Sequence, residues 1–266
     1  MARDAVHPHR GGAACAGGVV VGVDGSLGVL AAVSWAAAEA SRRGARLHLV
    51  EVPPAAVGAT DAHRSAPLRR ARGVASAVAP GIAISAEPLV GAVGPALRAR
   101  ARDADLLVIG SRRHTEPAIA PDGTTPFLLA GAACPTVVVP ARWAGSWAST
   151  PSARPVVVGL AGTAGDRGVQ ELAARVVRRL GVELISVWPR RRCSRDREDG
   201  GADLTEALLD VGRWAQLIVV SSSRVVRLER LLPRSPCAVM LPPSVVPPRP
   251  RERMVDSPCH RPVAPG

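Results

Sequence analysis

The stretch from Ala104 to Pro140 constrains the fold of this chain more than any other. It begins with an apolar run that ends in glycine, Ala104–Gly110, and closes with a second apolar run rich in β-branched residues, Cys134–Pro140. Short apolar runs of this kind are typical of strands buried on both faces of a parallel sheet. Between them, Gly110 permits a sharp turn or the close approach of a ligand, and Gly123-Thr124 opens a helix with free amides and a hydroxyl. The loop therefore predicts an anion site, with a phosphate group as the expected ligand.

Strands and helices alternate along the residues before this stretch. Apolar runs predict strands at residues 19–24, 46–52 and 82–90, and helical patterns predict helices at residues 27–43, 61–79 and 93–102. This alternation is typical of a parallel, doubly wound α/β sheet, in which ligands bind beyond the carboxyl ends of the strands. Asp24, Val52, Gly110 and Gly123 all lie at such ends in the predicted fold.

The glycine loop follows a recognisable spacing. Gly110, Gly123 and Thr124 fall into the pattern Gly-x2-Gly-x9-Gly-(Ser/Thr), with Arg113 at the second glycine position. The valine-rich first strand ends in Asp-Gly-Ser, and the last strand begins with Cys-Pro followed by hydrophobic residues. In these three features the chain resembles the universal stress protein family.

This resemblance implies an adenine-nucleotide site. In the ATP-binding members of the family, the loop wraps the phosphates, the aspartate that matches Asp24 contacts the adenosine, and the backbone of the valine that matches Val52 holds the adenine. The resemblance therefore implies ATP, or a related adenine nucleotide, as the ligand, with Mg²⁺ accompanying ATP as the only metal. The residues implied in binding are Asp24, Val52, Gly110, Arg113, Gly123, Thr124 and Thr125.

Arg113 leaves two hypotheses open for this site. If the position needs a positive φ, a residue other than glycine costs roughly 1–2 kcal/mol there, whereas a guanidinium could recover a similar amount by pairing with a phosphate. Glu116 and Asp122 also place negative charge near the expected phosphates. The chain is therefore either a stress-response module that binds ATP in this domain, or a dimerisation and interaction module of the same fold that has lost its ligand.

The chain repeats itself after residue 155 in a shorter form. Residues 156–163 echo residues 19–26 at a distance of 137 positions, and later segments echo the second, fourth and fifth strands. Ala161 stands in place of Asp24, Ser221 stands in place of Gly110, and most of the glycine loop is missing. The charged stretch 190–203 replaces one helix and one strand. We therefore expect a four-stranded sheet with no nucleotide site, which packs on the first copy as a second subunit would.

The predicted organisation has two domains of one fold class. That class is α/β, with two open, parallel, doubly wound sheets of the Rossmann-like, adenine-nucleotide α-hydrolase-like type, the second of them truncated. The predicted segments are a disordered tail at 1–18, a universal stress protein domain at 19–140, a linker at 141–154, a truncated, degenerate universal stress protein domain at 155–242 and a disordered Pro/Arg-rich tail at 243–266. The two domains are expected to form a pseudo-dimer within the chain, and a homodimer of chains is a further hypothesis.

Composition excludes several other classes of function. All 34 basic residues are arginine, and Lys, Asn and Tyr are absent, as a GC-rich coding sequence would produce. The net charge of +12 therefore does not by itself indicate a nucleic-acid partner, and no basic recognition helix stands out. Without lysine the chain can have neither a Walker A loop nor a Schiff-base nucleophile.

No pattern predicts catalysis, secretion or insertion into a membrane. The sequence shows no paired carboxylates, no nucleophile with a nearby base and no metal-ligand spacing, and its five cysteines are scattered. No apolar run approaches the roughly 20 residues that a membrane helix needs. We therefore expect a cytoplasmic protein that is not an enzyme and has no membrane partner.

Overall fold

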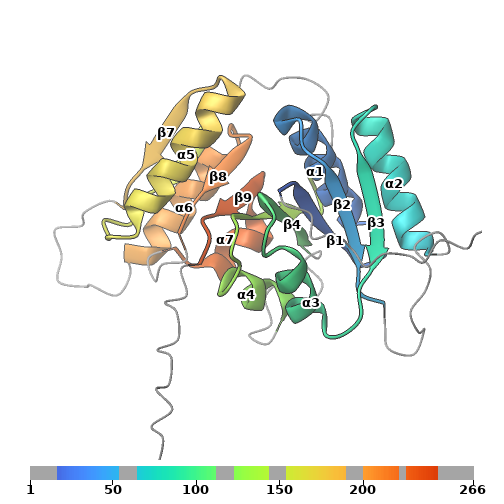
Figure 1. The fold of residues 1–266 in the computed structure, drawn as a ribbon. Helices are drawn as coiled ribbons and strands as arrows, with labels where there is room; N and C mark the ends of the chain where they lie inside the picture. Colours follow the sequence, from blue (N-terminus) through green and yellow to red (C-terminus); the bar gives the residue numbers. More distant parts are fainter. Residues whose placement is uncertain are drawn as a thin grey trace, which may run out of the picture.

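The computed structural model describes residues 17–53, 65–111, 123–143, 154–189, 200–221 and 226–244, which form one open sheet with helices on both faces (Figure 1). The strands are β1 (Val19–Val23), β2 (Leu47–Glu51), β3 (Ile84–Pro88), β4 (Leu106–Ser111), β5 (Thr136–Pro140), β6 (Val156–Gly159), β7 (Leu184–Val187), β8 (Leu217–Val219) and β9 (Ala238–Leu241). The helices are α1 (Val29–Arg43), α2 (Ala66–Val78), α3 (Val93–Arg100), α4 (Thr124–Leu129), α5 (Asp166–Leu180), α6 (Gly200–Gly212) and α7 (Leu228–Arg234).

The first half of the sheet is parallel, as the alternation of strands and helices predicted. Its order is β3-β2-β1-β4-β5. Val19 of β1 lies beside both Leu47 of β2 and Leu106 of β4, so these strands begin level with one another. All three residues are buried. Because helices cover both faces of the sheet, its central strands consist of continuous apolar runs rather than alternating ones.

The second half repeats the first with fewer elements. Its order, β9-β8-β6-β7, matches β5-β4-β1-β2, and the four strands agree with the sequence expectation. A Cβ added to Gly159 would lie 2.9 Å from Leu208 of α6, and one added to Gly22 would lie 3.2 Å from Leu97 of α3. Helix α6 therefore occupies the place of α3. The charged stretch expected at 190–203 is shorter, because residues 200–203 belong to α6.

Glycines at equivalent positions adopt the same backbone conformation in the two halves. Gly44 ends α1 with a φ of 59°, and Gly181, 137 positions later, ends α5 with a φ of 66°. Gly25 and Gly162, also 137 positions apart, both have a φ of 77°. Residues with a Cβ rarely adopt this left-handed conformation, so both halves require glycine at these points.

The two halves form one continuous sheet, not the two separate sheets that the sequence analysis expected. β5 and β9, the last strand of each half, pair in antiparallel fashion, with Thr136 opposite Leu241 and Val138 opposite Val239. Both strands are buried along their whole length. The open edge of a sheet carries unpaired backbone groups, and each of these edges completes the other. The prediction of two separate sheets was wrong, because the sequences of β5 and β9 each predict a strand but do not indicate that the two strands pair with each other.

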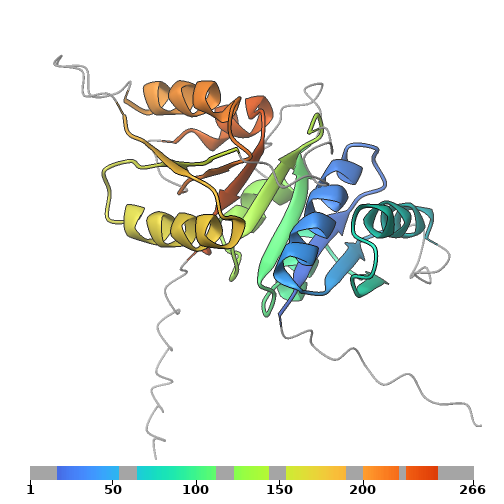
Figure 2. The ribbon, with the colours of Figure 1, turned by 90° about the horizontal axis from the view of Figure 1, so that it is seen from above.

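The helices form two layers that run across both halves. α1, α2 and α5 cover one face of the sheet, and α3, α4, α6 and α7 cover the other (Figure 2). Successive residues of a strand enter different layers, since Val19 and Val21 belong to the first core and Val20 to the second. Each core contains residues of both halves, so the halves share their hydrophobic interior. None of the described helices is long and apolar enough to cross a membrane.

Three predicted boundaries change in the structure. Ser65 caps α2 by accepting a hydrogen bond from the backbone N–H of Leu68 at 3.2 Å, while the predicted helix start at Asp61 lies outside the described residues. Trp143, in the predicted linker, is buried in the core on the α1 face. Ser244, in the predicted C-terminal tail, donates its backbone N–H to the carbonyl of Ala132 at 3.0 Å. The other residues of the tails and the linker lie largely outside the described ranges.

Candidate functional site

The loop after β1 presents Asp24 at the carboxyl end of the sheet. Asp24 Oδ1 accepts hydrogen bonds from the backbone N–H of Ser26 at 3.0 Å and from its hydroxyl at 2.7 Å. Ser26 Oγ in turn accepts from the N–H of Val29, the first residue of α1, at 3.3 Å. Asp24 is exposed, and its Oδ2 makes no hydrogen bond within the described part of the chain. The loop therefore holds one carboxylate oxygen in place and leaves the other open to a ligand.

Val52 and Gly110 flank Asp24 on the neighbouring strands. The parallel register places the three residues side by side at the carboxyl ends of β2, β1 and β4. Gly110 has no positive φ. An added Cβ would instead lie 3.4 Å from Cα of Val29. Glycine at this position thus lets the first turn of α1 approach β4 closely, which differs from the turn that the sequence analysis expected there.

Gly123, Thr124 and Thr125 form the start of α4. Gly123 is the N-cap with an extended backbone, and no side chain caps the helix. The first turn of a helix leaves its N–H groups without intrahelical partners, and Pro126 has no N–H. The amides of Thr124 and Thr125 are therefore the donors that this short helix can offer an anion.

Helix α4 is fastened to α3 through an aromatic contact. The guanidinium of Arg98 stacks over the ring of Phe127 at 3.7 Å from its centroid and also donates to the Phe127 carbonyl. A Cβ added to Gly94 of α3 would lie only 2.6 Å from the same ring. The position of the α4 N-terminus is thus set by packing against α3.

The predicted site residues fall into two groups in the structure. Asp24, Val52 and Gly110 lie together at the ends of adjacent strands. Residues 123–125 open α4, which lies on the face of the sheet opposite α1. The loop that connects β4 to α4, with Arg113, lies outside the described residues.

The equivalent loop of the second half is filled by its own carboxylate. Asp166 is buried and accepts hydrogen bonds from the N–H groups of Ala161 at 3.1 Å, Gly162 at 2.7 Å and Thr163 at 3.2 Å, and from the Thr163 hydroxyl at 3.3 Å. Val29 occupies the position of Asp166 in the first half, 137 positions earlier. Converging N–H groups of this kind are an anion site. In the second half that site is already satisfied within the chain.

Two interactions described here were not predicted from the sequence: the contacts of Asp166 within its loop, and the hydrogen bond between Ser65 and Glu51. The spacing Thr163-x-x-Asp166 fits a helix-capping pattern, and this signal could have indicated the filled loop. Beside Val52, the hydroxyl of Ser65 donates to Glu51 and joins the end of β2 to the start of α2. No pattern connects two residues that are 14 positions apart in this way, so only the fold brings them together.

The described residues show little sign of metal or thiol chemistry. They contain no group of three His, Cys, Asp or Glu side chains placed to hold a metal ion. Burial raises the pKa of the Cys134 thiol to about 11 and that of Cys237 to about 12. Both thiols therefore stay protonated near neutral pH, where they are poor nucleophiles.

Comparison with known proteins gives both a family and a fold. The family model described as Universal stress protein family matches residues 18–140. Among solved structures, a universal stress protein from Archaeoglobus fulgidus DSM 4304 is similar with a TM-score of 0.61 and 15% identity, over 85% of this chain and 96% of that chain. A universal stress protein solved in complex with cAMP is 24% identical, with a TM-score of 0.32, over 64% of this chain and 94% of that chain. No curated protein matches the chain.

The family match and the similar structures support different conclusions. The Archaeoglobus structure concerns the fold alone, and its coverage extends beyond residues 18–140 into the second half. The structure with cAMP differs from this chain in its overall arrangement. The family match covers the half that contains Asp24 and the glycine loop from Gly110 to Thr124. Residues 18–140 of this chain thus match the universal stress protein family.

Proposed function

We propose that the chain is a cytoplasmic stress-response module without enzymatic activity, and that it binds one adenine nucleotide, ATP, in its first half. One observation carries the proposal. The anion-binding loop of the second half is filled by Asp166, whereas Val29 stands at the equivalent position of the first half. The loop of the first half therefore has no second carboxylate beside Asp24 among the described residues, and Asp24 itself accepts only from Ser26.

Two groups of described residues support this proposal, one for each end of such a nucleotide. The open Oδ2 of Asp24 is an acceptor suited to the ribose hydroxyls, and Val52 offers backbone groups beside it for the adenine. The amides and hydroxyls of Thr124 and Thr125 are suited to phosphate oxygens. Because the described residues offer no cluster of metal ligands, Mg²⁺ would be held mainly by phosphate oxygens and water.

A second role, as a ligand-free interaction module, is favoured by the pairing of the halves. β9 covers the β5 edge of the first half, and Arg142 donates to the carbonyl of Ser235 across the same boundary at 2.7 Å. In this alternative the second half is a degenerate copy of the first that acts as its permanent partner. An intrachain pseudo-dimer of this kind is compatible with either role.

Calorimetric titration of ATP and Mg²⁺ into the full chain separates the two roles. Gly123→Asp is the sharpest variant, because it places a carboxylate at the α4 N-cap, beside the amides of Thr124 and Thr125. Aspartate is a good N-cap residue, so the variant should fold, yet its charge should exclude the phosphates. We expect wild-type binding in the micromolar range and its loss in Gly123→Asp.

A charge-matched pair of variants tests the other end of the site. Asp24→Asn removes one charge and keeps an acceptor for Ser26, and we expect it to weaken binding about tenfold or more, the effect of losing a charged hydrogen bond. Glu171→Gln removes one charge from an exposed residue of α5 and should leave affinity unchanged. Absence of binding at millimolar ATP in the wild-type chain would favour the ligand-free role.

A further inference from the structure

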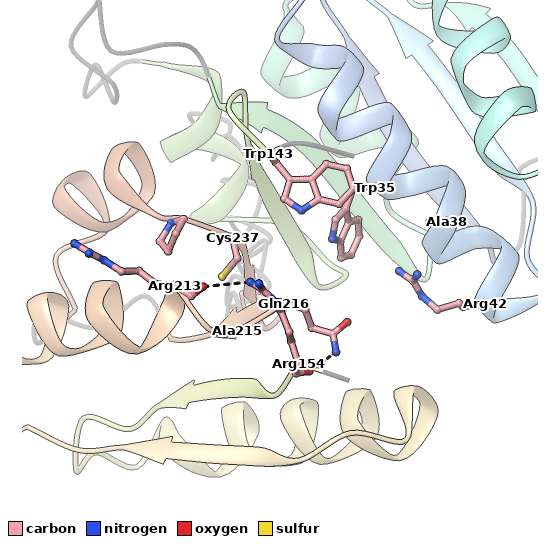
Figure 3. A pocket seen from close by; sticks show the side chains of 10 residues that line it. Trp35, Ala38, Arg42, Trp143, Arg154, Arg213, Ala215, Gln216 and Cys237 are labelled. Atoms are coloured by element: carbon pink, nitrogen blue, oxygen red, sulfur yellow. Dashed lines mark hydrogen bonds between the residues drawn. The ribbon is translucent and has the colours of Figure 1, made fainter. Parts of the chain in front are cut away.

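A cavity of about 340 Å³ lies where the two halves of the molecule meet (Figure 3). β5 and β9 are antiparallel, so the end of β5 lies at the same edge of the sheet as the starts of β9, β8 and β6. The cavity lies at this edge, and α1 of the first half forms its other side. The residues used most below are Trp35, Ala38, Arg42, Trp143, Arg154 and Cys237. None of them belongs to the candidate nucleotide site.

Two tryptophans form an apolar wall of this cavity. Trp35 comes from α1 and Trp143 follows β5, and only 6% and 9% of their surfaces are exposed. Figure 3 shows the two indole rings close to one another. Cys237 adds to the apolar lining, because burial raises its pKa to about 12 and a protonated thiol behaves as a small hydrophobic group. The cavity therefore offers broad ring faces to a ligand.

The polar groups around the cavity already have partners within the chain. Arg42 pairs with buried Glu39 at 3.1 Å. Arg154 donates to the backbone carbonyl of Arg213 at 3.2 Å, and the carbonyl of Arg154 accepts from the side-chain amide of Gln216 at 2.5 Å. Among the described residues that line the cavity, no buried polar side-chain atom lacks a hydrogen-bond partner. A ligand therefore gains little from a charge or from many hydrogen-bonding groups, whereas it would lose the hydration of those groups.

The charges around the cavity disfavour cations as well. The described lining residues include arginines but no carboxylate. Glu39, behind Arg42, is shared with Arg43 and Arg179 at 2.7 and 2.6 Å, so one carboxylate faces three guanidinium groups. A cationic ligand would meet this excess of positive charge, and an anion would find the guanidinium groups of Arg42 and Arg154 already paired. An uncharged ligand meets neither cost.

The volume of the cavity sets the size of its ligand. A cavity of about 150 Å³ holds one benzene molecule, and small-molecule sites span about 300–1,000 Å³. At about 340 Å³, this cavity has room for roughly two or three fused rings. We propose that it binds an uncharged, planar aromatic molecule of that size, which stacks on Trp35 and Trp143. Residues of both halves form the site, so a single domain would lack it.

The test follows the indole N–H signals of the full ¹⁵N-labelled chain while naphthalene-2-methanol, an uncharged planar probe, is added. The chain has five tryptophans, and Trp35→Phe and Trp143→Phe identify the signals of these two. We expect both signals to shift together and to saturate at submillimolar probe. Absence of a shift up to millimolar probe, or shifts confined to the other three signals, would overturn the proposal.

Three analogues of the probe test its charge and shape without any variant. Naphthalene-2-carboxylate and 2-naphthylmethylammonium carry the same rings with a negative and a positive charge, and decahydronaphthalene-2-methanol has a similar volume without flat faces. We expect each analogue to bind at least tenfold more weakly than naphthalene-2-methanol. Equal or tighter binding of a charged analogue would contradict an uncharged ligand, and equal binding of the decahydro analogue would contradict stacking on the tryptophans.

A variant that fills the cavity tests the location. Ala38 of α1 lines the cavity and is buried, so Ala38→Leu places a larger side chain in the space. Ala77→Leu makes the same change at an exposed position of α2 and is the control. We expect Ala38→Leu to weaken binding of the probe at least tenfold and Ala77→Leu to change it less than twofold, with both chains folded by circular dichroism. Unchanged affinity in a folded Ala38→Leu chain would place the probe elsewhere and contradict the proposal.

Discussion

Glu39 of α1 and Arg179 of α5 form an ion pair across the two halves, with 2.6 Å between Oε1 and Nη2. The Glu39 side chain is only 3% exposed, and it also pairs with Arg42 and Arg43 of its own helix. A buried carboxylate of this kind requires its partners, because an unpaired charge in the interior is costly. The pair therefore links the packing of α5 to that of α1.

Glu39→Ala is expected to lower the free energy of unfolding by roughly 3 kcal/mol, because it leaves three guanidinium groups without their shared partner. Arg179→Ala should cost only about 1 kcal/mol, since Arg179 is partly exposed and Glu39 keeps two partners. Urea unfolding measures both values. Glu171→Ala, which breaks the exposed pair with Arg167, is the control and should cost less than about 0.5 kcal/mol. Equal effects of the two variants would contradict this account.

The filled loop of the second half predicts that the carboxylates of the two equivalent loops differ in their contribution to stability. Asp166→Ala removes a buried acceptor of four hydrogen bonds and should cost roughly 2 kcal/mol. Asp24→Ala, in the exposed loop of the first half, should cost about 0.5 kcal/mol. Thermal unfolding of the two variants beside the wild type checks the difference. A larger loss for Asp24→Ala would show that the first loop, not the second, is the structural one.

The raised pKa values of two buried thiols predict protection from alkylation. At pH 8, iodoacetamide should leave Cys134 and Cys237 unmodified in the folded chain and modify both in urea, because their pKa values of about 11 and 12 suppress the thiolate. Peptide mass mapping gives the extent at each site. Since the unfolded thiols ionise near pH 9.0, stability should also fall as the pH rises from 9 toward 11. Rapid labelling of folded Cys237 would contradict its burial.

The lowered pKa of His48 predicts that the folded chain loses stability in acid. Burial, followed by the nearby Arg100 guanidinium, lowers the pKa of His48 below its usual 6.5. The unfolded chain therefore takes up a proton at a higher pH than the folded chain, so the contribution of His48 is complete above pH 6.5 and is lost as the pH falls below it. Tm measured between pH 5 and 8 should show this slope.

His48→Gln tests whether the slope belongs to this residue. The side chain lies in β2 with Nδ1 2.5 Å from the Ser85 hydroxyl, and a glutamine amide can offer similar hydrogen bonds. The variant should flatten the profile below pH 6.5. His9→Gln, outside the described residues, should leave it unchanged. An equal slope in His48→Gln would assign the effect to other groups.

Much of each half could be predicted because local patterns carry the information. Apolar runs such as Val19–Val23 predict buried strands wherever they pack, and Gly44 and Gly181 mark helix ends because other residues rarely adopt their φ. The register between adjacent parallel strands then brings Asp24, Val52 and Gly110 together. The role of Gly110 was harder to predict, because glycine permits both a turn and a close helix contact.

The sequence by itself determined the strands, the order of the elements, the repeat at 137 positions and the residues that the resemblance to the universal stress protein family assigns to a nucleotide site. Only the tertiary structure decided that β5 and β9 pair to make one sheet, that Asp166 fills the second loop and that Trp35 and Trp143 border a cavity with Arg154. The physical reason is that strand and helix patterns depend on neighbours within a few residues. The pairing of two strand edges, the burial of Glu39 and the closure of a cavity depend on contacts between residues more than 100 positions apart.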